Sequence, residues 1–234
     1  MTAMPDRVSI IVPALNEADG IVATLAMLQP LRILGHEVIL ADGGSSDDTV
    51  VLARGLTDAI TFSARGRSQQ MNVGAGQAAG DIFLFLHADT RLPERALHHM
   101  LDGLKATGQV WGRFDVRLSG RHPLLRVVER MMNWRSRLTG IATGDQAMFI
   151  CRDAFLAVGG YPAIALMEDI ALSRTLNRQF GAPLCLEATV MSSSRRWDQN
   201  GILRTMLLMW CLRLAYFFGV SPERLARQYE VPGR

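Results

Sequence analysis

Apolar and polar residues follow two different periods along the chain, and this pattern predicts an α/β fold. Short, mainly apolar runs at residues 8–12, 37–40 and 81–86 each end at a proline or a polar cluster, as the buried strands of a parallel sheet do. Between the first two runs, apolar residues recur at helical spacing after Asn16, which we expect to cap that helix. A strand, a helix and a strand within about 35 residues form a βαβ unit. We therefore expect a mostly parallel central sheet with helices on both faces.

The pattern changes after residue 109, where strict alternation replaces the apolar runs. Residues 110–118 place apolar side chains on one face and Arg113, Asp115 and Arg117 on the other, which predicts a half-exposed, antiparallel strand. No linker rich in Ser, Gly or Pro marks a boundary at this point of the sequence, so we expect one domain.

The composition fits a folded protein in a reducing compartment. Of the 234 residues, 49% are apolar and 20% are charged, which excludes intrinsic disorder. The three cysteines, Cys151, Cys185 and Cys211, are an odd number in apolar surroundings, so we expect reduced, buried thiols rather than disulfides or a zinc site. Residues 1–7 carry no apolar segment after their charges, so we expect no signal peptide and a cytoplasmic location.

The net charge of +3 is concentrated near the C-terminus. Residues 190–234 contain seven arginines and three acidic residues, a net charge of +4, so the first 189 residues carry −1. A nucleic-acid-binding protein needs a concentrated basic face, and the near-neutral body argues against that class. The basic end would suit the surface of an anionic membrane.

Three of the predicted strands are followed by polar clusters, at residues 13–17, 42–45 and 87–89. The carboxyl ends of parallel strands meet at one rim, where open α/β sheets bind ligands. Asp42 either caps a turn or presents a carboxylate that accepts hydrogen bonds from a nucleobase. Asp89 has no basic neighbour and suits a divalent cation held together with phosphate oxygens. His87 is open between a metal ligand, a phosphate donor and a plain polar residue.

Residues 74–79, Gly-Ala-Gly-Gln-Ala-Ala, match a dinucleotide-binding pattern. That pattern needs its glycines after a strand and at the start of a helix, so that the helix N-terminus meets pyrophosphate. Here the glycines end a helical stretch and precede a strand. They predict close helix packing and argue against a dehydrogenase.

Two later clusters each allow a structural and a chemical interpretation. Glu168 and Asp169 open a helix, where carboxylates cap the backbone or, kept ionised by the helix dipole, accept a proton. Residues 195–198 form a solvated loop anchored by Trp197 or a diphosphate site, because arginine presents a two-pronged fork to phosphate.

A strongly apolar helix is expected at residues 202–218. Arg204 and Arg213 interrupt it, so no uncharged stretch reaches the ~18–20 residues of a membrane-spanning helix. Two interpretations stay open: the helix packs on the domain, or it lies in a membrane interface.

Several of these segments resemble the family 2 glycosyltransferases of GT-A fold. The matching segments are residues 8–17, 42–45, 72–74, 83–89, 144–146, 168–169 and 196–197. The length of the chain and its Ser-Pro-Glu-Arg sequence at residues 221–224 are similar to a small bacterial subgroup. This subgroup is named rSAM/selenodomain-associated transferase 2 after its gene neighbours, a name that identifies no substrate.

The resemblance implies an inverting enzyme that uses a nucleotide-diphospho-sugar donor and a divalent cation, Mn2+ or Mg2+. Asp169 would be the catalytic base, Asp89 the metal ligand, and Asp42 a contact to the nucleobase. The other donor-binding residues would be Pro13, Ala14, Glu17, Arg67, His87, Ala88, Gly144, Asp145, Glu168, Arg196 and Trp197. The acceptor would present a hydroxyl or a phosphate, and a lipid-linked acceptor would fit a membrane interface.

One departure from the family pattern keeps rival functions in view. His87 stands where the family has an acidic residue, so the metal assignment depends on Asp89. A non-catalytic nucleotide-sugar-binding protein is therefore one alternative. A sugar nucleotidyltransferase, the other, would need a glycine-rich basic loop directly after the first strand, and residues 13–17 provide neither feature.

The expected organisation is one GT-A-like α/β domain over residues 1–234, with an apolar helix near its end. Its nucleotide-binding half would span about residues 1–109 and its acceptor and catalytic half about residues 110–200, followed by a helical appendage at about residues 201–234. We expect this protein in the cytoplasm, free or attached to the cytoplasmic face of a membrane.

Overall fold

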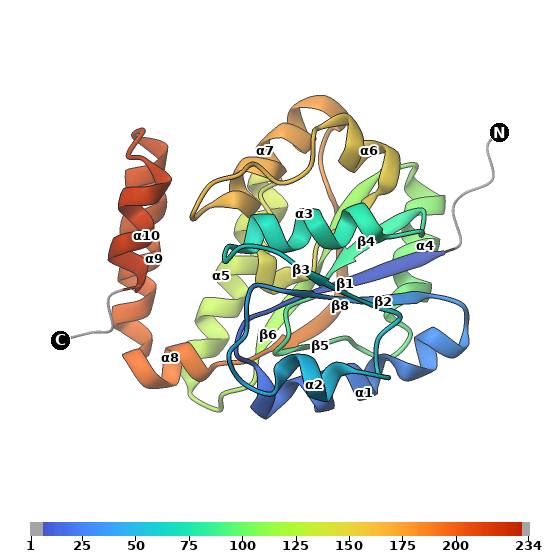
Figure 1. Ribbon diagram of the computed structural model, residues 1–234. Helices are drawn as coiled ribbons and strands as arrows, with labels where there is room; N and C mark the ends of the chain where they lie inside the picture. The colour runs from blue at the N-terminus through green and yellow to red at the C-terminus, as the bar shows by residue number, and fades with distance from the viewer. Residues whose placement is uncertain (1–6, 231–234) are drawn as a thin grey trace.

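The computed structural model describes residues 7–230 and joins their strands into one eight-stranded sheet (Figure 1). The order of strands across the sheet is β3-β2-β1-β4-β7-β6-β8-β5. The strands are β1 (Val8–Ala14), β2 (Glu37–Asp42), β3 (Ala59–Phe62), β4 (Ile82–Phe85), β5 (Thr90–Arg91), β6 (Trp111–Leu118), β7 (Phe149–Cys151) and β8 (Leu184–Ser192). The first four strands are parallel, and the short β7 runs antiparallel between β4 and β6.

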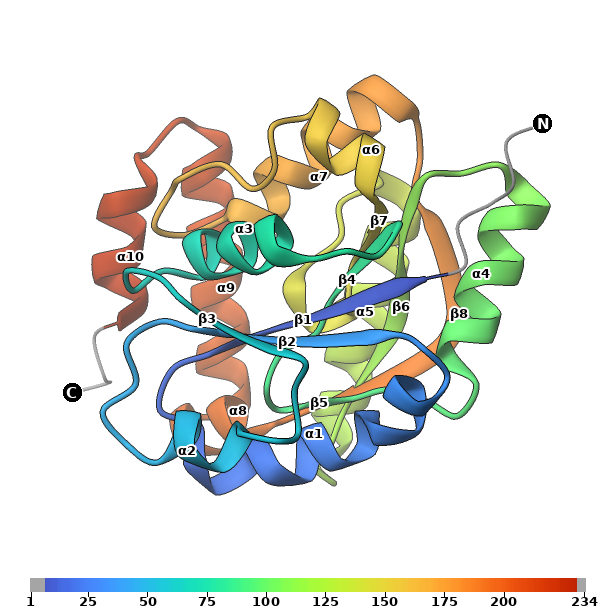
Figure 2. The ribbon, with the colours of Figure 1, turned by 45° about the vertical axis from the view of Figure 1, so that its right-hand side comes forward.

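Helices cover both faces of the sheet (Figures 1 and 2), which confirms the predicted α/β architecture. One face packs against α1 (Ala18–Ile33), α2 (Thr49–Ala53), α4 (Ala96–Thr107) and α5 (Pro123–Thr139). The opposite face packs against α3 (Arg67–Gln77), α6 (Arg152–Ala157) and α7 (Glu168–Phe180). The chain then continues through α8 (Arg195–Asn200), α9 (Ile202–Phe217) and α10 (Pro222–Glu230).

Consecutive residues of β1 and β2 point to opposite faces, and both faces are buried. Ile10 and Leu40 belong to the core on the α1 side, whereas Ile11 and Ile39 belong to the core on the α3 side. Because each strand needs apolar residues on both sides, its sequence is a continuous apolar run rather than an alternation. A ligand therefore meets this half of the sheet at the loops that follow its strands.

The Gly-Ala-Gly segment lies at the end of α3, before β4, as predicted. A β-carbon at Gly74 would lie 2.6 Å from Cγ2 of Ile11. The glycine thus lets α3 approach β1, and this helix end does not meet a ligand as a dinucleotide-binding loop would.

The predicted helix cap at Asn16 is wrong. The helix begins at Ala18, and Asn16 adopts a left-handed backbone conformation with a φ of 53°, which asparagine tolerates better than most residues. Its side-chain Oδ1 accepts a hydrogen bond from the backbone N–H of Ser46 at 2.8 Å. Asn16 therefore joins the loop after β1 to the loop after β2.

The half-exposed strand predicted at residues 110–118 is also only partly correct. β6 is antiparallel to β7 but parallel to β8, and Arg113, expected on a solvated face, is 0% exposed. Helix α5 covers that face. The Arg113 guanidinium donates to the carboxylate of Asp115 and to the carbonyl of Asn133, and these partners satisfy a charge that alternation alone would place in water.

The C-terminal helices α9 and α10 pack on each other and on the start of α7. Leu212 of α9 and Leu225 of α10 are buried in one cluster with Met167 and Ile170. Within residues 7–230, no helix is long and apolar enough to cross a membrane. The prediction that all three cysteines are buried is wrong. Cys211 is exposed on α9, and Cys151 and Cys185 are only partly buried.

Candidate functional site

A cavity of about 910 Å³ opens where β1 and β4 end, and eleven of the fourteen predicted site residues line it. They are Pro13, Ala14, Glu17, Arg67, His87, Ala88, Asp89, Asp145, Glu168, Arg196 and Trp197. Residues far apart in sequence therefore share one space. The three predicted residues outside this lining are Asp42, Gly144 and Asp169.

Helix α8 attaches the C-terminal part of the chain to the loop after β1. Arg195, which belongs to the predicted 195–198 cluster but not to the expected donor-binding residues, forms an ion pair with Glu17 at 3.3 Å. Trp197 packs against the main core, so the anchoring role foreseen for its indole is confirmed, although the segment is helical and not a loop. Glu17 thus has a partner from the opposite wall of the cavity.

Arg196 connects α8 to α10. Its guanidinium carbon lies 3.4 Å from the ring centre of Tyr229, and its Nη2 donates a hydrogen bond to the Tyr229 carbonyl at 3.0 Å. This cation–π contact fixes the plane of the fork. Tyr229 itself lines the cavity together with Thr205 and Met209 of α9, so two C-terminal helices form one wall of the site.

His87 and Asp145 meet at the floor of the cavity. Nδ1 of His87 lies 3.5 Å from Oδ1 of Asp145. Burial alone would raise the pKa of Asp145, but the hydrogen bond and charge of His87, with smaller contributions from Arg67 and Arg213, lower it below its usual value. A β-carbon at Gly144 would lie 2.5 Å from Nε2 of His87, so this histidine position requires a glycine opposite it.

The acidic pair at the start of α7 divides into two environments. Glu168 is buried and lines the cavity, and its burial, together with the like charge of Asp169, raises its pKa to about 7. Asp169 instead accepts hydrogen bonds from the backbone N–H groups of Gly144, at 3.0 Å, and Ile170, at 2.7 Å. Two bonds leave part of the accepting capacity of a carboxylate unused.

The residue before this pair has an unusual backbone. Met167 has a φ of 69°, in the left-handed region, where residues with a β-carbon carry a conformational cost. Its side chain is buried against α9 and α10. The start of α7 is therefore held from the side of the C-terminal helices.

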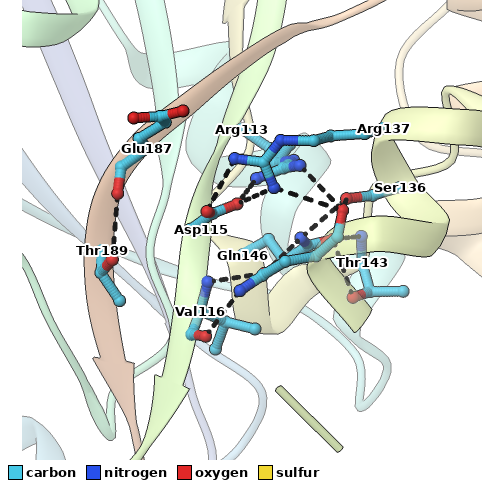
Figure 3. A network of polar contacts seen from close by, with 10 residues as sticks. Arg113, Asp115, Val116, Ser136, Arg137, Thr143, Gln146, Glu187 and Thr189 are labelled. Carbon is cyan, nitrogen blue, oxygen red and sulfur yellow. Dashed lines mark hydrogen bonds and ion pairs between the residues drawn. The ribbon is translucent and has the colours of Figure 1, made fainter. Parts of the chain in front are cut away.

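A polar network behind the cavity holds the short 3-10 helix η1 (Gly144–Gln146) in place (Figure 3). The side-chain amide of Gln146 donates to Ser136 of α5 at 3.1 Å and accepts from the backbone N–H of Thr143 at 3.2 Å. On the same side of α5, Arg137 donates to both carboxylate oxygens of Asp115. Because Gln146 follows Asp145 directly, this network fixes the backbone that carries the carboxylate beside His87.

Asp42 is buried, and its hydrogen bonds are local. Its carboxylate accepts from the backbone N–H groups of Gly44 and Ser45, each at 2.9 Å, and from the Ser45 hydroxyl at 2.5 Å. The turn interpretation therefore accounts for the contacts that Asp42 makes, and its contact with a nucleobase stays a prediction.

The sequence similarity to a known family lies within the first 157 residues. The model of glycosyl transferase family 2 matches residues 9–157. The chain belongs to this family.

Two curated relatives are similar in sequence to this family 2 glycosyltransferase. The uncharacterized glycosyltransferase Rv1514c of Mycobacterium tuberculosis is 27% identical over 218 residues, covering 86% of this chain and 78% of the relative. The poly-beta-1,6-N-acetyl-D-glucosamine synthase of Staphylococcus aureus is 25% identical over 191 residues, or 74% of this chain. Our chain spans about half, 46%, of that synthase.

Solved structures show the same fold at low identity. S. aureus TarS 1-349 in complex with UDP-GlcNAc is 17% identical with a TM-score of 0.66, and the match covers 80% of this chain and 58% of TarS. Glucosyl-3-phosphoglycerate synthase from Mycobacterium tuberculosis, in complex with Mn2+, UDP and glucosyl-3-phosphoglycerate, is 20% identical with a TM-score of 0.60. That match covers 79% of this chain and 70% of the synthase.

The described residues of the glycosyltransferase offer few side chains that could bind a metal ion. Among residues 7–230, no group of three or more His, Cys, Asp or Glu side chains could hold an ion. Asp89 nevertheless projects a carboxylate into the cavity, close in sequence to His87. One carboxylate fits a cation that takes most of its other ligands from a diphosphate and water, which is common for Mg2+.

Sequence motifs missed the residues that the C-terminal helices contribute. Thr205, Met209 and Tyr229 line the cavity, yet each lies in an amphipathic or apolar stretch without any local pattern that marks a ligand. The single available signal was the placement of arginines within residues 202–218, which a purely apolar helix would not contain.

Proposed function

We propose that the protein is an inverting glycosyltransferase that moves a sugar from a UDP-sugar to a hydroxyl or phosphate of an acceptor. The observation that carries the proposal is the gathering of eleven predicted site residues around one cavity. Two structures of similar fold were solved in complex with UDP-GlcNAc and UDP, which supports the choice of nucleotide. We also assign the chain to the rSAM/selenodomain-associated transferase 2 subgroup, on its length and its Ser-Pro-Glu-Arg sequence.

The donor would lie along the loops after β1 and β4. Pro13, Ala14 and Glu17 would border the nucleoside and Asp42 would contact its base, while Arg67 and Arg196 would face the diphosphate. Burial opposes the charge of Arg67, but Glu168, Asp145 and Asp169 among its negative neighbours raise its pKa. An arginine that stays charged in this cavity suits a diphosphate leaving group.

The divalent cation would be held by Asp89, with His87 beside it. When bound, such a cation offsets the negative charge that develops on the leaving diphosphate. His87 is itself hydrogen-bonded to Asp145, so its position is defined before the donor arrives.

Asp169 would act as the base that removes the acceptor proton. The backbone N–H groups of Gly144 and Ile170 orient its carboxylate, and a general base must be held in a fixed position. Glu168 lines the cavity directly and has a pKa of about 7, so it is the competing candidate. Either carboxylate can be replaced by the corresponding amide without changing the size of the side chain.

The test is a thermal-shift screen of UDP-, GDP-, CMP- and dTDP-sugars with Mn2+ or Mg2+, followed by assays of donor hydrolysis and transfer. A ligand that binds the native state raises its apparent stability by mass action. We expect UDP-sugars to give the largest metal-dependent shift. Binding without hydrolysis or transfer to any acceptor would favour a non-catalytic nucleotide-sugar-binding protein, and release of pyrophosphate from a nucleoside triphosphate would favour a nucleotidyltransferase.

A membrane contact through α9 belongs to the same proposal. Apolar residues at heptad spacing on α9 are exposed, among them Trp210 at 47% and Phe217 at 68%. Helix α5, which contacts α9, carries a second such stripe with Trp134 at 66%. Two exposed apolar stripes, one of them on the most basic part of the chain, suit an anionic lipid surface.

Liposome flotation tests the membrane contact. The wild type should float with vesicles of anionic phospholipid at low salt, and Trp210→Ser with Trp134→Ser should stay in the soluble fraction. Leu156→Ser, an equally exposed apolar residue on α6, is the matched control and should float. Recovery of wild-type protein as a dimer without vesicle binding would instead assign the two stripes to a second copy of the chain.

A further inference from the structure

A second cavity, of about 280 Å³, lies between α5 and the strand β6. Arginines from both elements line it, and none of its lining residues borders the large cavity. The lining consists of Val116, Arg117, Arg126, Glu129, Arg130, Asn133 and Thr189. Three arginines and one glutamate give this lining a net charge of +2, which suits a single small anion.

The cavity follows the edge of β6 that lacks a neighbouring strand. Among the described strands, β7 pairs with only the first two residues of that edge, so the backbone groups beyond them need other partners. The Asn133 side chain of α5 accepts from the Val116 N–H at 2.9 Å and donates to the Val116 carbonyl at 3.0 Å. Glu129 accepts from the Leu118 N–H at 2.5 Å. Side chains of α5 thus replace the missing strand and fix the walls of the cavity.

Arg126 is held in place inside this framework. Its Nη2 donates to the carbonyls of Leu118, at 2.7 Å, and Gly120, at 2.6 Å, and lies 3.0 Å from the Glu129 carboxylate. The charge of Glu129 is therefore offset by a fixed partner and repels an incoming anion less than an isolated carboxylate would. The contacts use one of the two terminal nitrogens of the Arg126 guanidinium.

Arg117 and Arg130 differ from Arg126 because they have no such contacts. Both are exposed, and neither has a hydrogen bond or an ion pair among the described residues. They border the same cavity from β6 and from α5. Two uncommitted guanidinium forks beside a fixed one can donate several charge-assisted hydrogen bonds to one phosphate group.

The cavity adjoins the exposed apolar stripe of α5. Arg126, Arg130 and Trp134 follow one another at four-residue spacing, so they form a single row along the helix. Trp134 is 66% exposed, and Val127 and Leu138 are exposed on its side of the helix. An anion in the cavity would therefore lie at the border between a basic and an apolar surface, as the headgroup of a lipid does.

We propose that Arg117, Arg126 and Arg130 bind the phosphate headgroup of an anionic phospholipid, at a site separate from that of sugar transfer. The acyl chains of the same lipid would cover the apolar stripe of α5. A phosphomonoester such as that of phosphatidic acid exposes the most oxygens to three arginines, so it should bind most tightly. This inference rests on the proposed membrane contact and adds a lipid preference to it.

The first experiment measures flotation with two kinds of vesicle at matched zeta potential. Both contain phosphatidylcholine, to which one adds phosphatidic acid and the other dioleoylglycerol succinate, an anionic lipid without a phosphate. We expect the wild type to bind the phosphatidic acid vesicles about 10-fold more tightly. The double variant Arg117→Gln with Arg130→Gln should bind both kinds equally. No preference in the wild type, or a preference that this variant retains, would overturn the proposal.

A second double variant provides the control for net charge. Arg54→Gln with Arg178→Gln removes two exposed positive charges from the end of α2 and from α7, and it should keep the preference. Any difference between the two double variants then reports the cavity rather than the total charge. Because Arg117 and Arg130 lack partners among the described residues, their replacement should leave the melting temperature and the affinity for UDP unchanged.

The second experiment separates a lipid site from a site for a free phosphate. Calorimetry compares monomeric dihexanoyl phosphatidic acid with glycerol 3-phosphate, which carries the same phosphomonoester without acyl chains. We expect the lipid to bind at least ~10-fold more tightly, since its chains cover the apolar stripe. Equal affinities would assign the cavity to a soluble phosphomonoester and overturn the lipid assignment.

The vesicle data also separate this inference from the one on which it rests. A wild type that floats with both kinds of anionic vesicle equally refutes the headgroup site and leaves the membrane contact intact. A wild type that binds no vesicle refutes both.

Discussion

The two walls of the cavity are built in different ways. The sheet wall consists of loops after β1 and β4, whose flanking strands are completely buried on both faces. The helical wall consists of α8, α9 and α10. It attaches to the sheet wall through the Arg195–Glu17 ion pair and the packing of Trp197, and several apolar residues of α9 are exposed. A wall fixed by two cores suits the recognition of a constant donor. A wall fixed by a few polar contacts and one small apolar cluster suits a variable acceptor.

The largest effect is expected from a substitution in α7, where the two walls meet. Asp169→Asn keeps the size of the side chain but cannot accept a proton, so transfer should fall by ~10²–10⁴, or roughly 3–5 kcal/mol of barrier. Donor affinity, which depends on the sheet wall, should stay near that of the wild type, as measured by calorimetry with UDP. A variant that retains most of its activity, while Glu168→Gln loses it, would assign the base to Glu168.

Glu168 gives the next largest effect, on stability rather than on rate. Its pKa is about 7 in the folded protein, above the ordinary glutamate value near 4.5. The folded state therefore binds this proton more tightly than the unfolded state, and the resulting stabilisation is complete below pH 4.5 and is lost as pH rises toward 7. That loss amounts to at most about 3 kcal/mol.

Unfolding in urea across this pH range measures the effect. Glu168→Gln should remove most of the pH dependence and exceed the wild type in stability above pH 7. Glu187→Gln, an exposed glutamate on β8, provides the comparison and should follow the wild-type curve. A wild type whose stability is flat between pH 4.5 and 7 would contradict the raised pKa.

Asp89 tests the sheet wall by itself. Asp89→Ala should abolish the metal-dependent part of UDP binding, an effect of about 2 kcal/mol for a charged ligand, without lowering the melting temperature. Calorimetry with and without Mn2+ is the measurement, and equal metal dependence in both proteins would show that the ion is held elsewhere. His87→Asp should strengthen metal binding if His87 occupies the first position of the metal motif.

Arg196 tests the helical wall with the smallest effect. Arg196→Lys keeps the charge but loses the stacking on Tyr229 and the fork, contacts worth about 1 kcal/mol. The KM for the UDP-sugar should rise about 5-fold, and the melting temperature of the protein should stay unchanged. Arg224→Lys, on the exposed side of α10, should leave the KM as it is.

The same contrast explains which parts were predictable from sequence. Strand ends such as Pro13 and Asp89 carry their signal locally, because a buried parallel strand has a recognisable apolar run and its next residues must reach the rim. Arg113 and Asn16 could not be predicted correctly. Their partners, the Asn133 carbonyl of α5 and the backbone of Ser46, come from segments that only the folded chain brings near.

The helical wall was hidden for a similar reason. Tyr229 and Arg213 belong to stretches whose helical periodicity predicts a packed helix. That periodicity does not predict which face of the helix lines a cavity. Which of Glu168 and Asp169 lines the cavity depends on η1, whose Gly144 N–H donates a hydrogen bond to Asp169.

Met167 has a practical consequence for work with shortened versions of this chain. A version that ended at Asn200 would keep every strand of the described sheet, and by circular dichroism it would pass for intact. It would nevertheless lose Leu212 and Leu225, the residues that cover Met167, and with them the support for its left-handed backbone. The first turn of α7 would then be free to rewind, and the acidic pair would leave its place, so a truncation made for crystallisation would yield a well-folded but inactive protein.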